Sequence, residues 1–394
     1  MTPDPRAASG RCLVLADLMR GGERVPGTVV VEDGVIVELC FGRRLSEPWA
    51  RTYDLPGALV LAGLIDLHVH GGGGFAAADG REHLRRLGAW LAARGVTGFL
   101  ASVPSRPQDE LCSACRAVAE AASAGDPPNL LGLHLEGPFL SPERAGSLPA
   151  GSFRQPSPLA YRSLRAVCGS WLKVLTIAPE LPGAGEVIAA CRRDGVVAAM
   201  GHTNAGFDEA RAGLSSGMAH VTHLFNAMSP FHHRAPGAVG AALTSETATA
   251  ELILDGEHVH PAAMALARSA MGASRLIVVS DALPVAGTAR ESSLWEGREV
   301  FRRGPRLVFA DGTLAGSAVS LNEALATAIG WGLEPAEAVA MASANPAAVL
   351  GLEGRKGRLV PGQDADLVVM DKDWRALLTL VRGRRVWPDQ RWQD

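Results

Sequence analysis

Short apolar segments alternate with segments of helical composition through the middle of this chain, and this alternation limits its possible folds more than any other feature. Eight apolar segments have the length and β-rich composition of buried strands. They are Gly63–His68, Gly98–Ser102, Leu130–Leu135, Val174–Ala178, Val197–Gly201, Val221–Leu224, Ala250–Leu254 and Leu276–Ser280. Helices are expected at Glu82–Arg94, Asp109–Ala124, Pro158–Val167, Gly183–Asp194, Asp208–Ser215, Pro261–Met271 and Leu321–Trp331. Such strand–helix units predict an α/β fold, a (β/α)8 TIM-type barrel with its active site at the C-terminal ends of the strands.

The two ends of the chain follow a different pattern, with short β-rich segments separated by turn signals. In the first sixty residues, strands are expected at Leu13–Ala16, Gly27–Glu32 and Val35–Leu39, with Asp33-Gly34 as a hairpin turn. In the last forty, they are expected at Gly357–Leu359, Asp366–Asp371 and Leu378–Val386, with a turn at Pro361-Gly362. We therefore predict a small β-sandwich domain formed from both termini, residues 1–62 and 348–394, with the barrel between them at 63–347.

Composition and charge argue against several classes of protein. The 394 residues are 47% hydrophobic and 20% charged, with a formal net charge of -3. This balance does not favour a nucleic-acid or anionic-membrane partner. No stretch approaches the roughly 18 uncharged apolar residues of a membrane span, and the first twelve residues lack the apolar core of a signal peptide. We therefore expect a cytoplasmic protein with no membrane partner.

Two of the cysteines, Cys112 and Cys115, form a C-x-x-C pattern in an Ala-rich helical segment. A zinc or redox site would need a second pair or a thioredoxin-like context. We interpret these residues as two thiols on one face of a helix.

The first apolar strand ends in two histidines spaced one residue apart. Asp66, His68 and His70 share one face of this strand, because strand side chains alternate between faces. Two imidazoles at this spacing can bind one cation, and Asp66 could orient one of them through a hydrogen bond.

Four other strands also end in residues that can bind a metal or carry a proton. These residues are Glu136, His202, His223 and Asp281. A single buried histidine is as often a satisfied core residue as a ligand, and a single aspartate after a strand is often a helix N-cap. Their recurrence at five strand ends of one barrel favours a shared site.

The chemistry of this set suits a divalent cation. Imidazole and carboxylate ligands fit zinc or ferrous iron, and such a cation lowers the pKa of bound water from about 15.7 to roughly 7. Glu136, His202 and His223 form a minimal ligand set. Asp281 is not needed in that set, and it suits a general base that takes a proton from water and returns it to a leaving nitrogen.

At this point the residues resemble a known family, the N-acetylglucosamine-6-phosphate deacetylases of the amidohydrolase superfamily. The shared motifs run through most of the chain. They are Gly63-Leu64-Ile65-Asp66-Leu67-His68-Val69-His70-Gly71, Leu135-Glu136-Gly137-Pro138-Phe139, Gly201-His202-Thr203-Asn204-Ala205, Thr222-His223-Leu224-Phe225-Asn226-Ala227-Met228, Asp255-Gly256-Glu257-His258, Ser280-Asp281-Ala282 and Leu314-Ala315-Gly316-Ser317. The Leu-Glu-Gly-Pro and His-Leu-Phe-Asn-Ala-Met patterns are the specific ones.

The resemblance implies roles for individual residues. Glu136, His202 and His223 would bind the primary metal and Asp281 would be the catalytic acid and base, while His68 and His70 would allow a second metal. Zinc is the expected ion, and iron, cobalt, manganese and nickel suit the same ligands. The residues expected to contact substrate are Asn226, the Ala227 backbone, Arg234, His258, Gly316 and Ser317, with His134 near the developing oxyanion.

The sequence departs from the family pattern at the sugar-binding positions. The family usually carries Lys-Gly-Ala-His where this chain has Ala145-Gly146-Ser147-Leu148, and Arg-Glu-Pro-Gly where it has Arg234-Ala235-Pro236-Gly237. Leu148 thus replaces a histidine and Ala235 a glutamate. In the family the second loop tends to reach the neighbouring subunit of a homodimer, whereas His232 and His233 would also suit a solvated loop.

These observations lead to one principal hypothesis and several rivals. We expect hydrolysis of N-acetylglucosamine 6-phosphate to glucosamine 6-phosphate and acetate, with one or two divalent cations per subunit of a homodimer. Close rivals are a deacetylase for the galactosamine epimer and an amidohydrolase for N-acyl amino acids. A barrel without activity, acting as a sensor or scaffold, would be expected to have lost ligands, and none is lost here.

Overall fold

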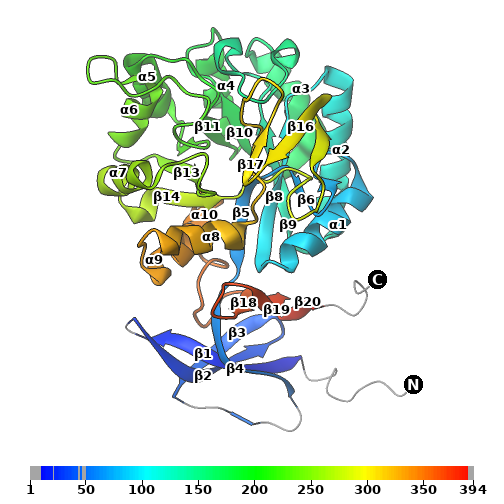
Figure 1. The fold of residues 1–394 in the computed structure, drawn as a ribbon. Coiled ribbons are helices and arrows are strands. Elements are labelled where there is room, and N and C mark those ends of the chain that lie inside the picture. Colours follow the sequence, from blue (N-terminus) through cyan, green and yellow to red (C-terminus); the bar gives the residue numbers. More distant parts are fainter. Residues whose placement is uncertain (1–9, 21, 43–44, 47–49, 389–394) are drawn as a thin grey trace.

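The computed structural model describes residues 10–20, 22–42, 45–46 and 50–388, and its larger part is the expected barrel (Figure 1). Eight parallel strands are hydrogen-bonded in the order β14-β13-β12-β11-β10-β9-β8-β5. Their bounds are β5 Leu64–Val69, β8 Val96–Pro104, β9 Leu130–Glu136, β10 Leu172–Ile177, β11 Val197–Met200, β12 His220–Val221, β13 Thr249–Ile253 and β14 Leu276–Val279. All eight strand predictions are confirmed, with ends within two residues except in β12. That strand stops at Val221, because the chain turns directly after it.

The barrel closes between β14 and β5 through loop backbone and one buried carboxylate. Asp281 donates its backbone N–H to the His68 carbonyl at 2.9 Å, just beyond the end of β14. The preceding residue, Ser280, donates its hydroxyl to Asp66 Oδ2 at 2.6 Å. Asp66 also accepts the backbone N–H groups of His68 and Ser280, each at 3.3 Å. Asp66 therefore holds the closing strands together, which corrects the expectation that it orients a histidine ring.

Helices surround the barrel strands in the order that the sequence predicts. Their bounds are α1 Arg81–Ala92, α2 Gln108–Ala124, α3 Pro158–Cys168, α4 Ala184–Arg193, α5 Phe207–Ser216, α6 Gly237–Leu243, α7 Pro261–Met271, α8 Leu321–Gly330, α9 Pro335–Met341 and α10 Ala344–Val349. Single-turn helices lie at Pro142–Arg144, Ala150–Ser152, Gly169–Trp171 and Ala273–Arg275. The seven predicted helices are confirmed. Helices α6, α9 and α10 were not predicted. Each has only six or seven residues, and α6 is also buried on all sides and so has no amphipathic period.

Between β14 and α8 the chain inserts a three-stranded antiparallel sheet that the sequence analysis did not predict. We call residues 292–308 the flap; it comprises β15 Ser292–Trp295, β16 Arg298–Arg303 and β17 Arg306–Val308. Figure 1 shows it in yellow against the barrel. Its apolar side packs in one cluster with Leu140, Leu148 and Leu283 from loops at the barrel mouth. A further short hairpin, β6 Gly71–Gly72 and β7 Phe75–Ala76, follows β5.

The small β domain is built from both ends of the chain, as predicted (Figure 1). Its strands form one continuous sheet in the order β20-β19-β18-β4-β1-β2-β3, and strands from both ends share one apolar core. The bounds are β1 Arg11–Arg20, β2 Glu23–Glu32, β3 Val35–Phe41, β4 Arg51–Ala62, β18 Leu367–Met370, β19 Ala376–Val381 and β20 Arg384–Trp387.

Two strand predictions in this domain are wrong. Residues Gly357–Leu359 form a bend and irregular backbone, and Leu378–Val386 is a hairpin rather than a single strand. Arg382 and Gly383 make its turn with φ angles of 48° and 70°. The Asp33-Gly34 hairpin turn is confirmed, with φ angles of 48° and 83°.

Direct hydrogen bonds join the small sheet to the barrel. Gly63 donates its backbone N–H to the Asp366 carbonyl at 2.9 Å, and Thr379 donates its hydroxyl to the Ala92 carbonyl at 2.7 Å. Within the described ranges, the longest helices are too short or too polar to cross a membrane.

Candidate active site

The candidate metal ligands meet at the C-terminal mouth of the barrel, as the strand-end argument predicts. They come from five different strands or the loops directly after them, and all are buried. The residues are His68, His70, Glu136, His202, His223 and Asp281.

The backbone at three of these positions is itself unusual. His202, His223 and Asp281 have φ angles of 46°, 30° and 46°. Residues other than glycine adopt this left-handed region at a cost of about 1–3 kcal/mol, and such conformations concentrate at functional sites. The strained turns place the three side chains where the strands end.

Glu136, His202 and His223 form one compact group, which we call the primary cluster. Glu136 Oε1 lies 2.9 Å from His202 Nε2 and 3.1 Å from His223 Nε2. The two imidazole nitrogens are also 3.1 Å apart. The three ligand atoms therefore point at a common position.

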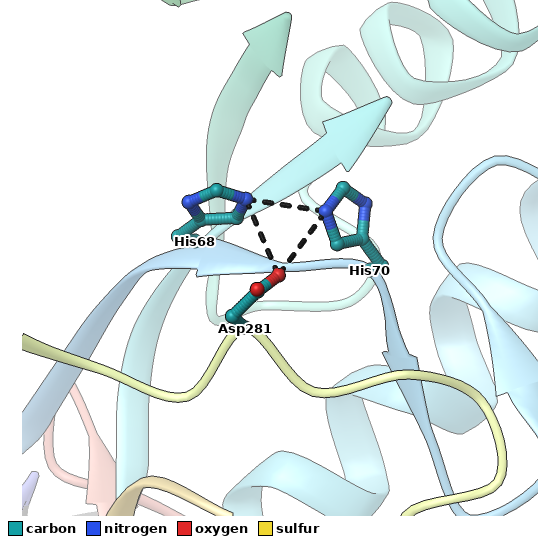
Figure 2. Close-up of side chains that lie close together, drawn as sticks. All are labelled: His68, His70 and Asp281. Atoms are coloured by element: carbon teal, nitrogen blue, oxygen red, sulfur yellow. Dashed lines mark hydrogen bonds and ion pairs between the residues drawn. The ribbon is translucent and has the colours of Figure 1, made fainter. Parts of the chain in front are cut away.

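His68, His70 and Asp281 form the second cluster (Figure 2). The Nε2 atoms of the two histidines are 3.1 Å apart. Asp281 Oδ1 lies 3.4 Å from His68 Nε2 and 3.3 Å from His70 Nε2. Asp281 is therefore close enough to serve this cluster as a ligand as well as to act as a base.

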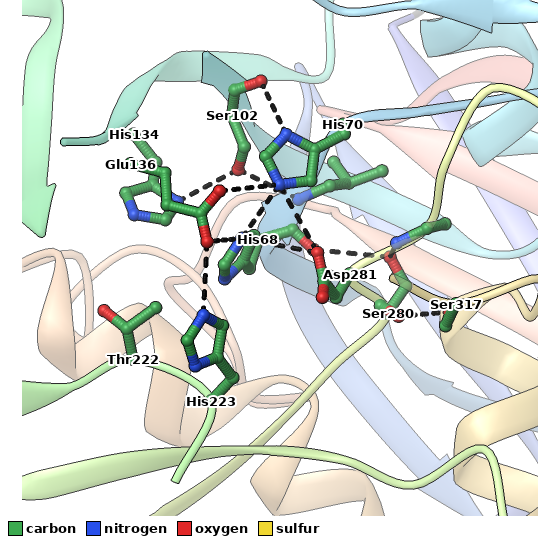
Figure 3. Close-up of polar contacts among 12 residues, drawn as sticks. His68, His70, Ser102, His134, Glu136, Thr222, His223, Ser280, Asp281 and Ser317 are labelled. Carbon is green, nitrogen blue, oxygen red and sulfur yellow. Dashed lines mark hydrogen bonds and ion pairs between the residues drawn. The ribbon is translucent and has the colours of Figure 1, made fainter. Parts of the chain in front are cut away.

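Glu136 links the two clusters (Figure 3). Its Oε1 lies 3.6 Å from His68 Nε2, and its Oε2 lies 3.3 Å from His70 Nε2. A carboxylate shared in this way is typical of sites with two neighbouring cations, which in hydrolytic enzymes lie about 3.5–4 Å apart.

Hydrogen bonds on the far side of three rings leave Nε2 available as a ligand. His68 Nδ1 lies 3.0 Å from Glu251 Oε2, His70 Nδ1 3.2 Å from the Ser102 carbonyl, and His202 Nδ1 2.9 Å from the Arg144 carbonyl. Each of these oxygens can only accept, so Nδ1 carries the hydrogen and, in a neutral ring, Nε2 presents a lone pair. Lone pairs that face each other at 3.1 Å fit a cation between them.

The electrostatic environment also favours positive charge. Burial opposes protonation of His68, but the charges of Asp281, Glu251 and Glu136 outweigh it and raise the pKa of His68 to about 10. Burial likewise opposes protonation of His70, but hydrogen bonds and charges from Asp281 and Glu136 raise its pKa to about 9. The donor set and its negative surroundings therefore fit a divalent cation at each cluster.

Sequence reasoning missed Glu251, the carboxylate that contacts His68 Nδ1. It lies within β13 and is buried among the barrel strands. The available signal was an acidic residue inside the apolar segment Ala250–Leu254, where a carboxylate needs a partner.

A cavity of about 240 Å³ opens over the two clusters. Of the expected substrate contacts, Asn226, Ala227, His258 and Gly316 line it. Trp295, on the flap, lines it as well, with its ring 4.9 Å from that of His70. Its Nε1 is buried without a hydrogen-bond partner among the described residues. A buried donor without a partner costs about 1–3 kcal/mol. A bound molecule that accepts a hydrogen bond from Nε1 would recover that cost.

His258 is prepared for an anion by its neighbour Asp255. His258 Nδ1 lies 2.7 Å from Asp255 Oδ2. Burial opposes protonation, but the hydrogen bond and charge of Asp255 outweigh it and raise the pKa of His258. The ring is therefore disposed to carry a positive charge at the wall of the cavity.

His134 and Ser317 do not line this cavity, so their expected substrate contacts stay predictions. His134 is fully buried and is held by Ser102 Oγ at 3.0 Å and Thr176 Oγ1 at 2.8 Å. Both ring nitrogens are thus engaged, and the ring lies beside that of His68. Ser317 donates its backbone N–H to the Asp281 carbonyl at 2.9 Å, so it supports the turn that carries Asp281.

Arg234 also lies away from the cavity of its own chain. It sits in an exposed loop, where Nη1 is 2.9 Å from His233 Nε2. His232 and Ala235 in the same loop are exposed, as expected of a solvated or intersubunit segment. Arg234 is not among the residues that line the cavity, so its contact with substrate stays a prediction.

Together, fold and site define a class: a (β/α)8 barrel with a candidate binuclear metal centre at the strand ends, partly covered by a flap. A comparison with known protein families agrees with this class. The chain belongs to the amidohydrolase family, whose model matches residues 59–386.

Individual relatives resemble the chain over most of its length. It is 35% identical to N-acetylglucosamine-6-phosphate deacetylase of Bacillus subtilis, over 91% of this chain and 92% of that protein. It is also 35% identical to N-acetylgalactosamine-6-phosphate deacetylase of Escherichia coli, over 83% of this chain and 87% of that protein. The crystal structure of N-acetyl-D-glucosamine-6-phosphate deacetylase from Mycobacterium smegmatis superposes with a TM-score of 0.89 at 32% identity, covering 95% of this chain and 100% of that one.

Proposed function

We propose that this protein hydrolyses N-acetylglucosamine 6-phosphate to glucosamine 6-phosphate and acetate. The observation that carries the proposal is the convergence of the primary cluster and Asp281 on one cavity that His258 also lines. The relatives with this activity over nearly the whole chain support the same substrate.

The proposed mechanism assigns each step to residues around the cavity. A divalent cation held by Glu136, His202 and His223, with zinc as the expected ion, would supply Lewis-acid activation of water and of the acetyl carbonyl. Asp281 takes a proton from the attacking water and gives it to the amine nitrogen as the C–N bond breaks. Water and the amide are thereby converted to acetate and the free amine.

The remaining wall of the cavity suits the sugar phosphate. A protonated His258 can donate a hydrogen bond to an anion, and such a charge-assisted bond is stronger than a neutral one. Asn226 and the Ala227 backbone lie on the same wall. We therefore propose that these three positions hold the sugar phosphate.

The decisive assay measures acetate release from purified protein together with its metal content. Replacement Asp281→Asn should lower kcat by about 10²–10⁴-fold, the usual contribution of a general acid–base group. The variant should retain a cation at the primary cluster, because none of those ligands changes. Asparagine cannot take up the proton, so turnover like that of the wild type would exclude this role for Asp281.

The alternative substrate predicted from the sequence is the galactosamine epimer, which is the substrate in the name of the Escherichia coli relative. The two sugar phosphates differ only in the orientation of the C4 hydroxyl, so the ratio of their kcat/KM values separates the candidates. An N-acetyl amino acid in the same panel serves as a control that should not be hydrolysed.

We further propose a homodimer in a reducing compartment, the cytoplasm. Phe231 is 56% exposed beside Arg234 on the loop that lies away from the cavity. Aromatic residues and arginine are enriched at protein interfaces, so Arg234 could complete the site of a second copy. Free thiols at Cys12, Cys112, Cys115, Cys168 and Cys191 fit a reducing compartment. A monomeric mass in light scattering would contradict the dimer.

A further inference from the structure

Glu251 is a buried carboxylate that the proposed mechanism does not use. It is only 1% exposed, on β13 inside the barrel. Oε2 lies 3.0 Å from His68 Nδ1 and accepts the backbone N–H of His223 at 3.1 Å, while Oε1 lies 3.1 Å from His220 Nε2. A charge in this position costs several kcal/mol unless it is paired and hydrogen-bonded, so each contact has energetic weight.

The contact with His68 determines which nitrogen of that ring can bind a cation. Because Glu251 accepts from Nδ1, the opposite nitrogen, Nε2, is left facing the second cluster. That atom lies 3.1 Å from His70 Nε2 and 3.4 Å from Asp281 Oδ1. A ring freed from Glu251 could rotate, or could carry its hydrogen on Nε2, and either change would remove the ligand.

His220 extends the same chain of contacts away from the site. Its Nδ1 lies 2.7 Å from Thr249 Oγ1, and its Nε2 contacts Glu251. His220 of β12 thus contacts Glu251, and Thr249 of β13 contacts His220. The carboxylate is fixed before any cation arrives.

We infer that Glu251 is the positioning residue for a divalent cation bound by His68, His70 and Asp281. This inference rests on the metal site of the proposed function. It goes beyond that function because it assigns the orientation of His68, a ligand in the second cluster, to a residue that contacts neither cation nor substrate. The primary cluster depends on Glu251 less, because there the contact is with the backbone of His223 and not with its ring.

The test counts cations and does not depend on any substrate. Apoprotein prepared with a chelator is titrated with Zn²⁺ alone, and the two dissociation constants are measured by calorimetry and elemental analysis. The wild type should bind two equivalents. Glu251→Gln, which keeps the shape but loses the charge, should weaken the second equivalent by about 10–100-fold, the usual effect of removing a carboxylate behind a ligand histidine. The first equivalent should be unchanged.

Two further variants separate positioning from a loss of structure. Thr97→Val removes a buried hydroxyl from the barrel strand β8, where it donates to the Leu64 carbonyl at 3.4 Å. It should leave the second equivalent unchanged. In a His70→Gln background, where a ligand is already missing, adding Glu251→Gln should cause no further loss of affinity.

The possible results are distinguishable from those that test the substrate. A wild type that binds one equivalent, or a Glu251→Gln variant that binds both within about 3-fold of the wild type, would overturn the inference. An equal loss of both equivalents would also overturn it, since the role would then be structural. A selective loss of the second equivalent supports it even in a protein that releases no acetate from a sugar phosphate.

Discussion

Replacing Leu148 by histidine tests how the cavity differs from that of the family that the sequence resembles. The family usually carries histidine at this position, so the change restores a polar group. In this structure, however, Leu148 is 3% exposed and belongs to the apolar cluster beneath the flap. Its neighbours there include Leu140, Leu283 and Trp295. The side chain that lines the cavity is instead that of Ser147.

The structure gives the size of the expected effect. Loss of a fully buried leucine side chain costs about 1.5–3 kcal/mol of transfer free energy, part of which the imidazole carbons recover. A buried imidazole without partners costs about 1–3 kcal/mol more. The free energy of unfolding should therefore fall by about 2–4 kcal/mol. For a chain of this length, that corresponds to a fall in Tm of about 2–5 °C.

Thermal unfolding and steady-state kinetics measure the two sides of this prediction. Leu148→His should unfold earlier and should gain no affinity for the sugar phosphate. The matched control is Ser147→His, which adds the same ring to a half-buried residue at the cavity wall and should change Tm little. If Leu148→His were as stable as the wild type and had a lower KM, the assignment of Leu148 to an apolar cluster would be wrong.

Two further predictions concern the wall of the cavity. Asp255 raises the pKa of His258, so the protonated ring persists, and KM should rise only as pH passes above that raised pKa. Asp255→Asn removes the charge and should move this rise in KM to lower pH. Identical pH profiles of kcat/KM for the variant and the wild type would contradict the argument. Trp295→Phe keeps a ring beside His70 but removes the orphaned indole N–H, so KM should increase about 2- to 12-fold with kcat nearly unchanged, equivalent to one lost hydrogen bond. An unchanged KM would show that the indole makes no bond to substrate.

The fold was predictable because its signals are local. Each barrel strand is a short apolar run, and Glu136 and Asp281 stand where two such runs stop. Strand ends converge in a barrel, so five positions far apart in sequence could be assigned to one site. The motifs of the resembled family supplied the roles that spacing alone left open.

What could not be predicted depends on contacts between distant residues. Glu251 sits in an apolar run, and only the barrel brings it to His68. The family resemblance implied His134 near the developing oxyanion, yet Ser102 and Thr176 occupy both of its nitrogens. The flap was missed because its strands are short and half-exposed, with no clear alternation.

The origin of the small sheet from both chain ends has a consequence for synthesis. Strand β4 pairs with β18, for example through Ala62 and Leu367, so the two partners are about 300 residues apart. At about 5–20 residues per second, a ribosome needs tens of seconds to make the second partner after the first. During that interval β4 presents an open sheet edge, and the nascent chain is exposed to wrong pairing until its last strands emerge.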